Sequence, residues 1–259
     1  METLNSSDIK KLLDDEVLKR NSTNELSFEK PDPLLIAKQY NEEYISLICA
    51  LFAYGNAKHI VKFLDALDFS FLKQDESIIK RELKDLYRFQ SNNDVINFFI
   101  ALKRLKDTDS LENIFNLGYK KENNVLEGIS SIIEAILNIN DYYSDGYKFL
   151  IGKLPKRDQI GNIKLIGNSA YKRYNMFLRW MVRKDHLDMG LWKSVDKADL
   201  ILPLDTHTFK ISQKLGLLTR KTYDLKSAIL ITEKLKEFDN EDPIKYDFAL
   251  YRIGQEKII

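Results

Sequence analysis

The sequence is poor in the residues that cross-link or interrupt a protein fold. Its 259 residues include one cysteine, Cys49, ten glycines and five prolines. A single cysteine excludes an internal disulfide and a cysteine-rich zinc or iron–sulfur site. Few glycines and prolines, together with 31% charged residues, favour helices. No stretch alternates apolar and polar residues over the length of a strand, so the sequence predicts an all-α fold.

Long apolar runs are also missing. The longest of them, such as residues 45–53, are too short to span a bilayer. The N-terminal segment 1–11 is polar and acidic and lacks the apolar core of a signal peptide. We therefore expect a soluble, cytoplasmic protein that does not bind membranes.

The net charge of +1 conceals an uneven distribution. Residues 151–221 hold 15 Lys and Arg against 6 Asp, a net of +9, whereas the rest of the chain has a net of −8. A basic segment on an otherwise acidic chain is typical of a protein that binds a polyanion such as nucleic acid. A solvated lysine-rich surface without a partner has the same composition, and composition alone leaves both interpretations open.

Apolar residues recur at helical spacing along most of the chain. The patterns predict helices at about 7–19, 31–40, 44–53, 57–67, 75–89, 92–106, 110–117, 125–138, 143–150, 169–184, 205–216, 224–238 and 243–252. The segment 152–168 differs, because glycines and basic residues concentrate there, and we expect a loop. On the helix 169–184, Lys172, Arg179 and Arg183 lie on one side, since spacings of 7 and 11 residues return to nearly the same azimuth.

A second segment of interest begins at Pro203. Asp205 is a good helix N-cap, and Leu204 and Phe209 occupy the two positions of a hydrophobic staple. Gly216 offers a stop to the helix. Asp205 at this point can serve only as a cap, or it can also present a carboxylate to a ligand, and the local sequence is compatible with both.

The segment Pro203-Leu204-Asp205-Thr206-His207, followed by Phe209-Lys210, resembles the Val-Asp-Thr-His signature of the helix-hairpin-helix DNA glycosylases, the endonuclease III superfamily. Lys172 follows a glycine-containing turn at the start of a helix, where that superfamily places its nucleophilic lysine. The stretches 53–57, 171–216 and 242–250 also resemble a small bacterial family of conserved proteins. The resemblance therefore covers most of the chain from about residue 31.

The chain departs from the superfamily pattern in two places. The usual hairpin reads Leu-Pro-Gly-x-Gly-x-Lys, whereas residues 165–172 read Leu-Ile-Gly-Asn-Ser-Ala-Tyr-Lys and lack the second glycine. Lys172 and Asp205 are 33 residues apart, which is longer than in endonuclease III and similar to the archaeal GO glycosylases that excise 8-oxoguanine. The missing cysteines exclude the iron–sulfur cluster of endonuclease III.

The resemblance implies a two-lobed, all-α glycosylase fold. One lobe, residues 41–195, would be a helical bundle that ends in the helix-hairpin-helix region at about 160–184. The second lobe, residues 1–40 with 196–259, would carry the catalytic aspartate. Lys172 and Asp205 would then face each other across the cleft between the lobes.

The resemblance also implies a reaction. The protein would flip an oxidised purine, 8-oxoguanine, out of duplex DNA and break its N-glycosidic bond. Lys172 would be the nucleophile, which gives a Schiff base and strand cleavage by β-elimination, and Asp205 would stabilise the developing oxocarbenium charge. An amine reacts in this way when burial or cationic neighbours, here Arg173 and Arg179, favour its neutral form. Lys172 as a simple phosphate contact is the competing interpretation.

Two further groups of residues are predicted to contact DNA. Phosphate and groove contacts are predicted for Lys164, Gly167, Asn168, Ser169, Arg173, Arg179, Lys184, Tyr54 and Asn56. The pocket for the flipped base is predicted from Trp192, His207, Phe248 and Tyr251, although such aromatic residues are also typical of a core. The three histidines lack metal-ligand spacing, so we expect no metal and no cofactor. The expected partner is double-stranded DNA with a damaged base, bound in the nucleoid by a monomer.

Two rival functions stay open at this stage. A glycosylase for alkylated purines would need an electron-rich stacking pocket and would not require a lysine nucleophile. A non-catalytic helical protein that kept the hairpin would bind DNA in a salt-dependent way without releasing a base. An RNA-binding helical protein is less favoured, because no aromatic sheet platform is readable.

Overall fold

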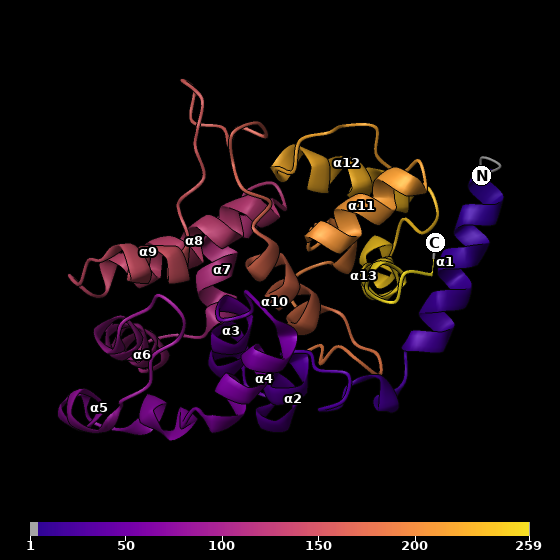
Figure 1. The fold of residues 1–259 in the computed structure, drawn as a ribbon. Helices are drawn as coiled ribbons and strands as arrows, with labels where there is room; N and C mark the ends of the chain where they lie inside the picture. Colours follow the sequence, from indigo (N-terminus) through magenta and orange to yellow (C-terminus); the bar gives the residue numbers. More distant parts are fainter. Residues whose placement is uncertain (1–4, 259) are drawn as a thin grey trace. The chain divides into compact units, whose positions relative to one another are not determined.

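The computed structural model describes residues 5–258, so the prediction for the polar N-terminus falls partly on residues outside this range. Thirteen α-helices and four short 3-10 helices are assigned in the described part of the chain, and no strand is. The all-α prediction is therefore confirmed (Figure 1). Among the described residues, no helix is both long enough and apolar enough to cross a membrane.

The chain divides into two compact units. One unit, here called the middle unit, consists of residues 26–155, and the other, the terminal unit, consists of residues 1–25 together with 156–259. The predicted lobes had their boundary at residue 195 instead. Residues 156–195 are tied to the C-terminal helices by ion pairs of Arg179 with Asp247 and of Arg183 with Asp242, as described below.

The middle unit is a helical scaffold. Its elements are α2 (Leu34–Tyr40), α3 (Glu43–Leu51), α4 (Ala57–Ala66), the 3-10 helix η2 (Phe69–Lys73), α5 (Glu76–Glu82), α6 (Asn92–Lys106), α7 (Leu111–Tyr119), α8 (Val125–Asn138) and α9 (Asp145–Ile151). Side-chain caps set several of the starts. Asn56 caps α4, and Ser91 and Asp94 form a reciprocal capping box at α6.

One predicted helix of the middle unit is much shorter than expected. The pattern predicted a helix over about 75–89, but α5 ends at Glu82. Arg88 has a φ of 58°, which a non-glycine residue rarely adopts within a helix. Tyr87 and Gln90 pair in an isolated antiparallel bridge, so residues 83–90 form a turn that the apolar spacing did not reveal.

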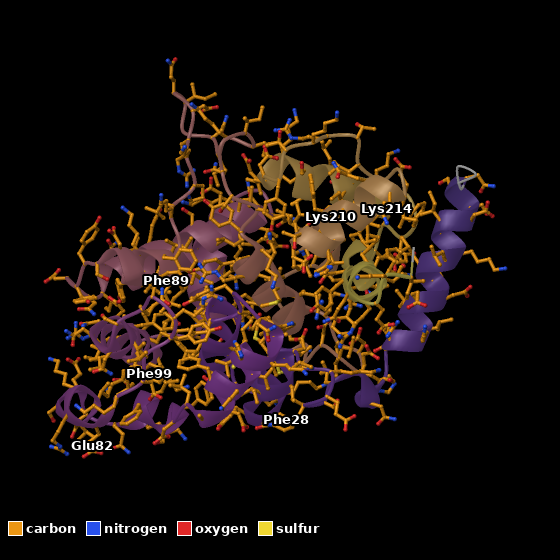
Figure 2. All side chains as sticks on the ribbon, viewed as in Figure 1. Phe28, Glu82, Phe89, Phe99, Lys210 and Lys214 are labelled. Atoms are coloured by element: carbon orange, nitrogen blue, oxygen red, sulfur yellow. The ribbon has the colours of Figure 1, made fainter. Side chains whose placement is uncertain are left out.

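The terminal unit carries the segments singled out for chemistry. Its elements are α1 (Ser6–Arg20), η1 (Thr23–Glu25), α10 (Lys172–Val182), η3 (Lys197–Asp199), α11 (Thr206–Lys214), α12 (Leu225–Lys236), η4 (Pro243–Tyr246) and α13 (Asp247–Gln255). Helix α13 packs on α11 and on α1. A Cβ at Gly254 of α13 would come within 2.9 Å of His207 Cβ, so glycine permits the close approach to α11. Lys210 and Lys214 project from the exposed side of α11 (Figure 2).

Candidate active site

Asp205 starts helix α11 as the sequence predicted. Its Oδ1 accepts a hydrogen bond from the backbone N–H of Thr208 at 2.8 Å, which satisfies one of the free amides of the first turn. At the other end, Gly216 adopts a φ of 72°, and the N–H of Leu217 donates to the carbonyl of Ser212 at 2.9 Å. This is the glycine-dependent end of a Schellman motif. The predicted start and stop of this helix are both confirmed.

The Asp205 carboxylate is only partly used by this cap. Its side chain is half-buried, and within the described residues its Oδ2 accepts no hydrogen bond and forms no ion pair. The cap holds one oxygen and thereby fixes the direction of the other. A carboxylate that is oriented in this way can stabilise a positive charge brought against its second oxygen.

Lys172 is the first residue of α10. Its Nζ lies 3.3 Å from the sulfur of Met176, one helical turn further on, and the side chain is half-buried. Within residues 5–258 it forms no ion pair. A thioether is a weak acceptor, so this amine is positioned without being neutralised by a carboxylate.

Asp247 connects these two residues electrostatically. It is buried at the start of α13, and its Oδ2 lies 2.5 Å from Nη1 of Arg179. Burial raises the pKa of Asp247 to about 6, against the opposing effect of Arg179. The charge of Asp205 also raises this pKa and the charge of Lys172 lowers it. Both predicted catalytic residues therefore lie within electrostatic reach of one buried carboxyl group.

Sequence analysis did not assign Asp247 to the site. Its neighbours in the sequence indicate only a helix start, and its importance depends on the ion pair that it forms with Arg179 of α10. The one available signal was the position of Arg179, seven residues after Lys172 and thus on the same side of α10. The spacing predicts on which side of α10 Arg179 lies, but it does not predict that Asp247 is the carboxylate with which Arg179 pairs.

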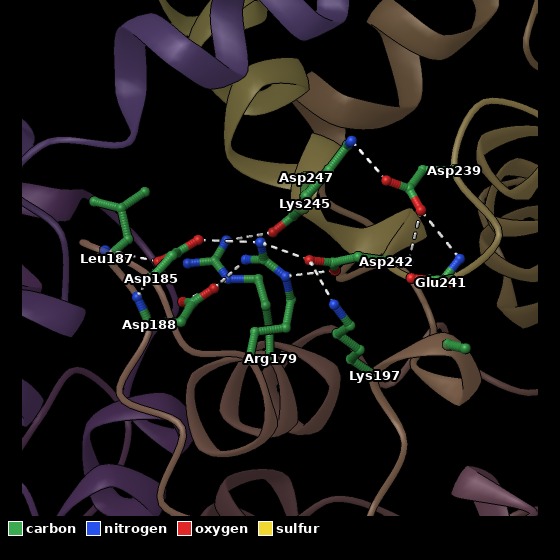
Figure 3. A network of polar contacts seen from close by, with 12 residues as sticks. Arg179, Asp185, Leu187, Asp188, Lys197, Asp239, Glu241, Asp242, Lys245 and Asp247 are labelled. Carbon is green, nitrogen blue, oxygen red and sulfur yellow. Dashed lines mark hydrogen bonds and ion pairs between the residues drawn. The ribbon is translucent and has the colours of Figure 1, made fainter.

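Arg179 belongs to a buried network of ion pairs (Figure 3). Its Nε lies 3.1 Å from Oδ1 of Asp188. Arg183, also buried, pairs with Asp188 and places its Nε 2.7 Å from Oδ1 of Asp242. Buried arginines are retained by such pairing, because an unpaired buried charge is costly. The prediction that Arg179 contacts a DNA phosphate is therefore corrected: its guanidinium is inside the protein and links α10 to α13.

The turn before α10 differs from the predicted hairpin. Residues 152–171 contain no helix, so the first helix of a helix-hairpin-helix motif does not precede Lys172. Tyr171 has a φ of 47° and leads directly into α10, while Gly167 and Ser169 are exposed. The predicted helix 169–184 thus begins three residues late. Within the predicted helix-hairpin-helix region at 160–184, the structure therefore has one helix, α10, preceded by a loop.

Asn168 holds this turn together. Its Nδ2 donates to the carbonyls of Lys156 at 3.1 Å and Lys164 at 2.7 Å, and its Oδ1 accepts from the N–H of Lys156 at 2.8 Å. The side chain is buried. We therefore correct the prediction that Asn168 grips a phosphate, since its side-chain amide is occupied by the loop. Gly167 and Ser169 remain predicted contacts.

The four predicted base-pocket residues divide into two pairs. Trp192 is buried edge-on against Phe177, with ring centroids 5.3 Å apart. Phe248 is buried between the guanidinium groups of Arg179 and Arg252, at 5.5 and 4.9 Å from its ring centroid. These are environments of core residues rather than of open stacking surfaces, and the prediction for both is corrected accordingly.

His207 and Tyr251 are the accessible pair. His207 is exposed on α11 and Tyr251 half-buried on α13. Their rings lie perpendicular with centroids 6.0 Å apart. His207 follows Asp205 by two residues, so the pair includes a side chain from the first turn of the helix that Asp205 caps. These two residues remain the prediction for the base pocket.

The other predicted DNA contacts lie at several places. Lys164 and Lys184 are exposed and Arg173 is half-buried. Tyr54 and Asn56 belong to the middle unit. The Tyr54 hydroxyl donates to Gln90, and the Asn56 side chain accepts from the N–H of Lys58 at 3.0 Å while it caps α4. Within residues 5–258, no group of three or more His, Cys, Asp or Glu is placed to hold a metal ion.

The raised pKa of Asp247 predicts a pH dependence of stability. Between about pH 4 and pH 6 the folded protein binds a proton at Asp247 that the unfolded chain releases. The free energy of unfolding contributed by this group therefore falls as the pH rises through that window, by up to about 3 kcal/mol. Asp247→Asn should remove this component. Denaturant titrations at intervals between pH 4 and 7 measure it as the difference between wild type and variant.

The matched control for this experiment is Asp14→Asn. The pKa of Asp14 is lowered, by hydrogen bonds from Lys10 and Tyr246 that outweigh its burial, so its contribution changes only below about pH 4. The free energy of unfolding is compared between wild type and Asp247→Asn at each pH. If their difference stayed constant from pH 4 to 6, the pKa of Asp247 would not be raised.

Comparison with protein-family models gives one match. Residues 32–256 match a family described as "Protein of unknown function (DUF2400)". No curated protein and no solved structure matches the chain.

Proposed function

The chain belongs to the DUF2400 family, whose description assigns no activity, and from its site we propose that the protein is a DNA glycosylase with an associated lyase activity. The observation that carries the proposal is the state of two side chains of the terminal unit: the Lys172 amine forms no ion pair within the described residues, and the Asp205 carboxylate is oriented by the N–H of Thr208. A lysine without an ion pair and an oriented carboxylate, within one packed unit, are the two groups that a glycosylase of the endonuclease III type requires.

The proposed reaction begins with a nucleotide extruded from the duplex. The Nζ of Lys172, as the free amine, forms a bond to C1′ while the N-glycosidic bond breaks and its electron pair leaves with the base. The departing base takes up a proton. Asp205 stabilises the positive charge that develops on the sugar between bond breaking and bond making.

The same adduct leads to strand cleavage. Opening of the sugar ring, with protonation of its oxygen, gives a protonated Schiff base between C1′ and Nζ. Loss of a proton from C2′ then expels the 3′ phosphate by β-elimination, and water releases the lysine. Lys172 acts as a covalent catalyst throughout, so no metal or cofactor is required.

The proposed substrate is 8-oxoguanine in double-stranded DNA. This choice rests on the 33-residue separation of Lys172 and Asp205, which is similar to that in archaeal GO glycosylases. His207, two residues after Asp205, forms a ring pair with Tyr251, and these are the side chains proposed to contact the extruded base. We propose that the protein acts as a monomer in the nucleoid.

A panel of duplexes, each with a single lesion, tests this proposal. The panel contains 8-oxoguanine, an alkylated purine, an abasic site and no lesion, and is scored for released base and for strand nicking. Release of 8-oxoguanine with nicking supports the proposal. Release of the alkylated purine without nicking indicates the alkylpurine enzyme instead. Salt-dependent binding with no base released from any duplex indicates a non-catalytic DNA-binding protein.

A further inference from the structure

A short two-stranded arm precedes α10 in the terminal unit. The arm consists of residues 156–164 and is called the basic arm below. The N–H of Lys164 donates to the carbonyl of Lys156 at 2.9 Å, and the N–H of Asp158 donates to the carbonyl of Asn162 at 2.8 Å. Arg157 and Ile163 pair in an isolated antiparallel bridge. The connection that contains the arm extends away from α10 as a long excursion of the backbone (Figure 1). Sequence analysis expected only a loop there.

The tip of the basic arm is held in a defined conformation. Oδ1 of Asp158 accepts hydrogen bonds from the N–H groups of Ile160 at 3.0 Å and Asn162 at 2.9 Å. Gly161 adopts a φ of +94°, which an L-residue could not adopt without strain. At the base, Asn168 fixes both strands through the three hydrogen bonds described above. The arm is therefore a built element with a fixed turn.

The turn presents an apolar side chain to solvent. Ile160 is 83% exposed, the highest value among the large apolar side chains of the described residues. Burying such a side chain would stabilise a protein by about 1.5–3 kcal/mol. The exposed position of Ile160 therefore contributes no such stabilisation to the fold. Ile166, 59% exposed, lies just beyond the base of the arm. An apolar tip on a rigid arm is suited to insertion into a partner.

The arm also carries accessible positive charge of the 151–221 segment. Arg179 and Arg183 of that segment are buried in ion pairs, so their charges are neutralised internally. Lys156 and Lys164 are exposed and form no ion pair within residues 5–258. The one acidic residue of the arm, Asp158, is engaged in the turn. The exposed lysines fit a partner with many negative charges, and Ile160 fits a partner with an apolar interior in which it can be buried.

We infer that the basic arm is a duplex-DNA contact in which Lys156 and Lys164 bind backbone phosphates and Ile160 enters the minor groove as a wedge between base pairs. The inference rests on the proposed function for the choice of DNA as the polyanion. Minor-groove proteins insert single apolar side chains between base steps while neighbouring basic residues hold the phosphates. A membrane surface would offer anionic groups too, but the tip of the arm presents a single isoleucine, which supplies little apolar area for insertion into lipid.

Binding of the full-length protein to an undamaged duplex tests the two parts of the inference separately. Lys156→Ala/Lys164→Ala should reduce the slope of log Kd against log salt by about 1.8, because each phosphate contact contributes about 0.9. Ile160→Ala should leave this slope unchanged and weaken binding about tenfold. With 2-aminopurine in the duplex, wild type should increase the fluorescence by unstacking the probe, and Ile160→Ala should not.

Matched controls come from the same unit. Lys11→Ala/Lys257→Ala removes two exposed lysines outside the basic segment, and Leu18→Ala removes an apolar side chain that is 78% exposed on α1. Both should bind as wild type does. All variants are surface changes, and thermal melting checks that they fold. An unchanged salt slope in the double variant, or unchanged fluorescence with Ile160→Ala, would overturn the inference.

The outcomes separate the arm from the proposed glycosylase. If no lesion is excised while the arm variants still lose DNA affinity, the arm is supported and the proposed function fails. If excision is normal and the arm variants bind as wild type does, the function stands and the arm assignment is overturned. Flotation with phosphatidylserine vesicles completes the test, because Ile160-dependent binding to vesicles without any effect on DNA would assign the arm to a membrane surface.

Discussion

Lys172→Gln should abolish covalent trapping of the protein on DNA. Borohydride reduces the Schiff base between C1′ and Nζ to a stable amine, so wild-type protein incubated with 8-oxoguanine duplex and borohydride should give a cross-linked band on a denaturing gel. A glutamine amide does not form a Schiff base. The trapped product should therefore fall from a major fraction of the DNA to background.

The variant should otherwise resemble the wild type. Lys172 forms no ion pair within the described residues, so its replacement leaves no buried charge without a partner, and the melting temperature should change by only a few degrees. At most one phosphate contact is lost, and DNA affinity at moderate salt should fall by less than about tenfold. Loss of trapping with retained DNA binding would therefore show that Lys172 is needed for the covalent step and not for folding or binding.

Lys210→Gln is the matched control for the nucleophile. Lys210 is an exposed lysine on α11, five residues after Asp205, and its amine should not reach C1′. This variant should be trapped as efficiently as the wild type. Trapping of Lys172→Gln at the wild-type rate would show that another amine is the nucleophile. If the wild type released the base but was never trapped, the enzyme would have glycosylase activity without lyase activity. Lys172 would then be a DNA-binding residue.

The parts of the site that the sequence predicted are those with local causes. The start of α11 depends on the N-cap Asp205 and on apolar residues within one turn of it, and its end depends on Gly216. Each of these acts over a few residues, so the sequence around 203–216 contains the whole explanation. The predicted starts of the helices at residues 57 and 92 also have local causes, because the side chains of Asn56 and Ser91 cap α4 and α6.

The parts that the sequence did not predict depend on packing between distant segments. Arg179 looked like a surface cation because α10 has a polar side, but its guanidinium is buried in ion pairs with Asp188, in the loop after α10, and with Asp247, at the start of α13. Asn168 looked like a phosphate contact because it follows Gly167, but its side chain closes a loop with Lys156, twelve residues earlier. Helical periodicity gives the direction of a side chain and does not identify the group that it meets.

Asp205→Asn should slow base excision by about two to three orders of magnitude, the usual cost of removing one group that stabilises transition-state charge. Single-turnover excision of 8-oxoguanine measures this directly. Lesion binding should change little, because the charge acts on the developing cation and not on the bound ground state. Since Asn caps helices nearly as well as Asp, the free energy of unfolding should change by less than about 0.5 kcal/mol.

Asp224→Asn is the matched control, because Asp224 caps α12 as Asp205 caps α11, with its Oδ1 accepting from the N–H of Ser227 at 3.0 Å. It should excise at the wild-type rate even though its ion pair with Arg220 is lost. A slow Asp224→Asn variant would mean that cap integrity, and not the Asp205 charge, limits excision.

A second readout of Asp205→Asn does not depend on activity. The charge of Asp205 helps to hold the pKa of Asp247 at about 6, so its removal should lower the pKa of Asp247. Carboxyl carbon chemical shifts followed by NMR during a pH titration measure that pKa in both proteins. An unchanged Asp247 pKa would show that the two carboxyl groups are not neighbours, and the grouping of Lys172, Asp205 and Asp247 as one site would then fail even if the variant excised slowly.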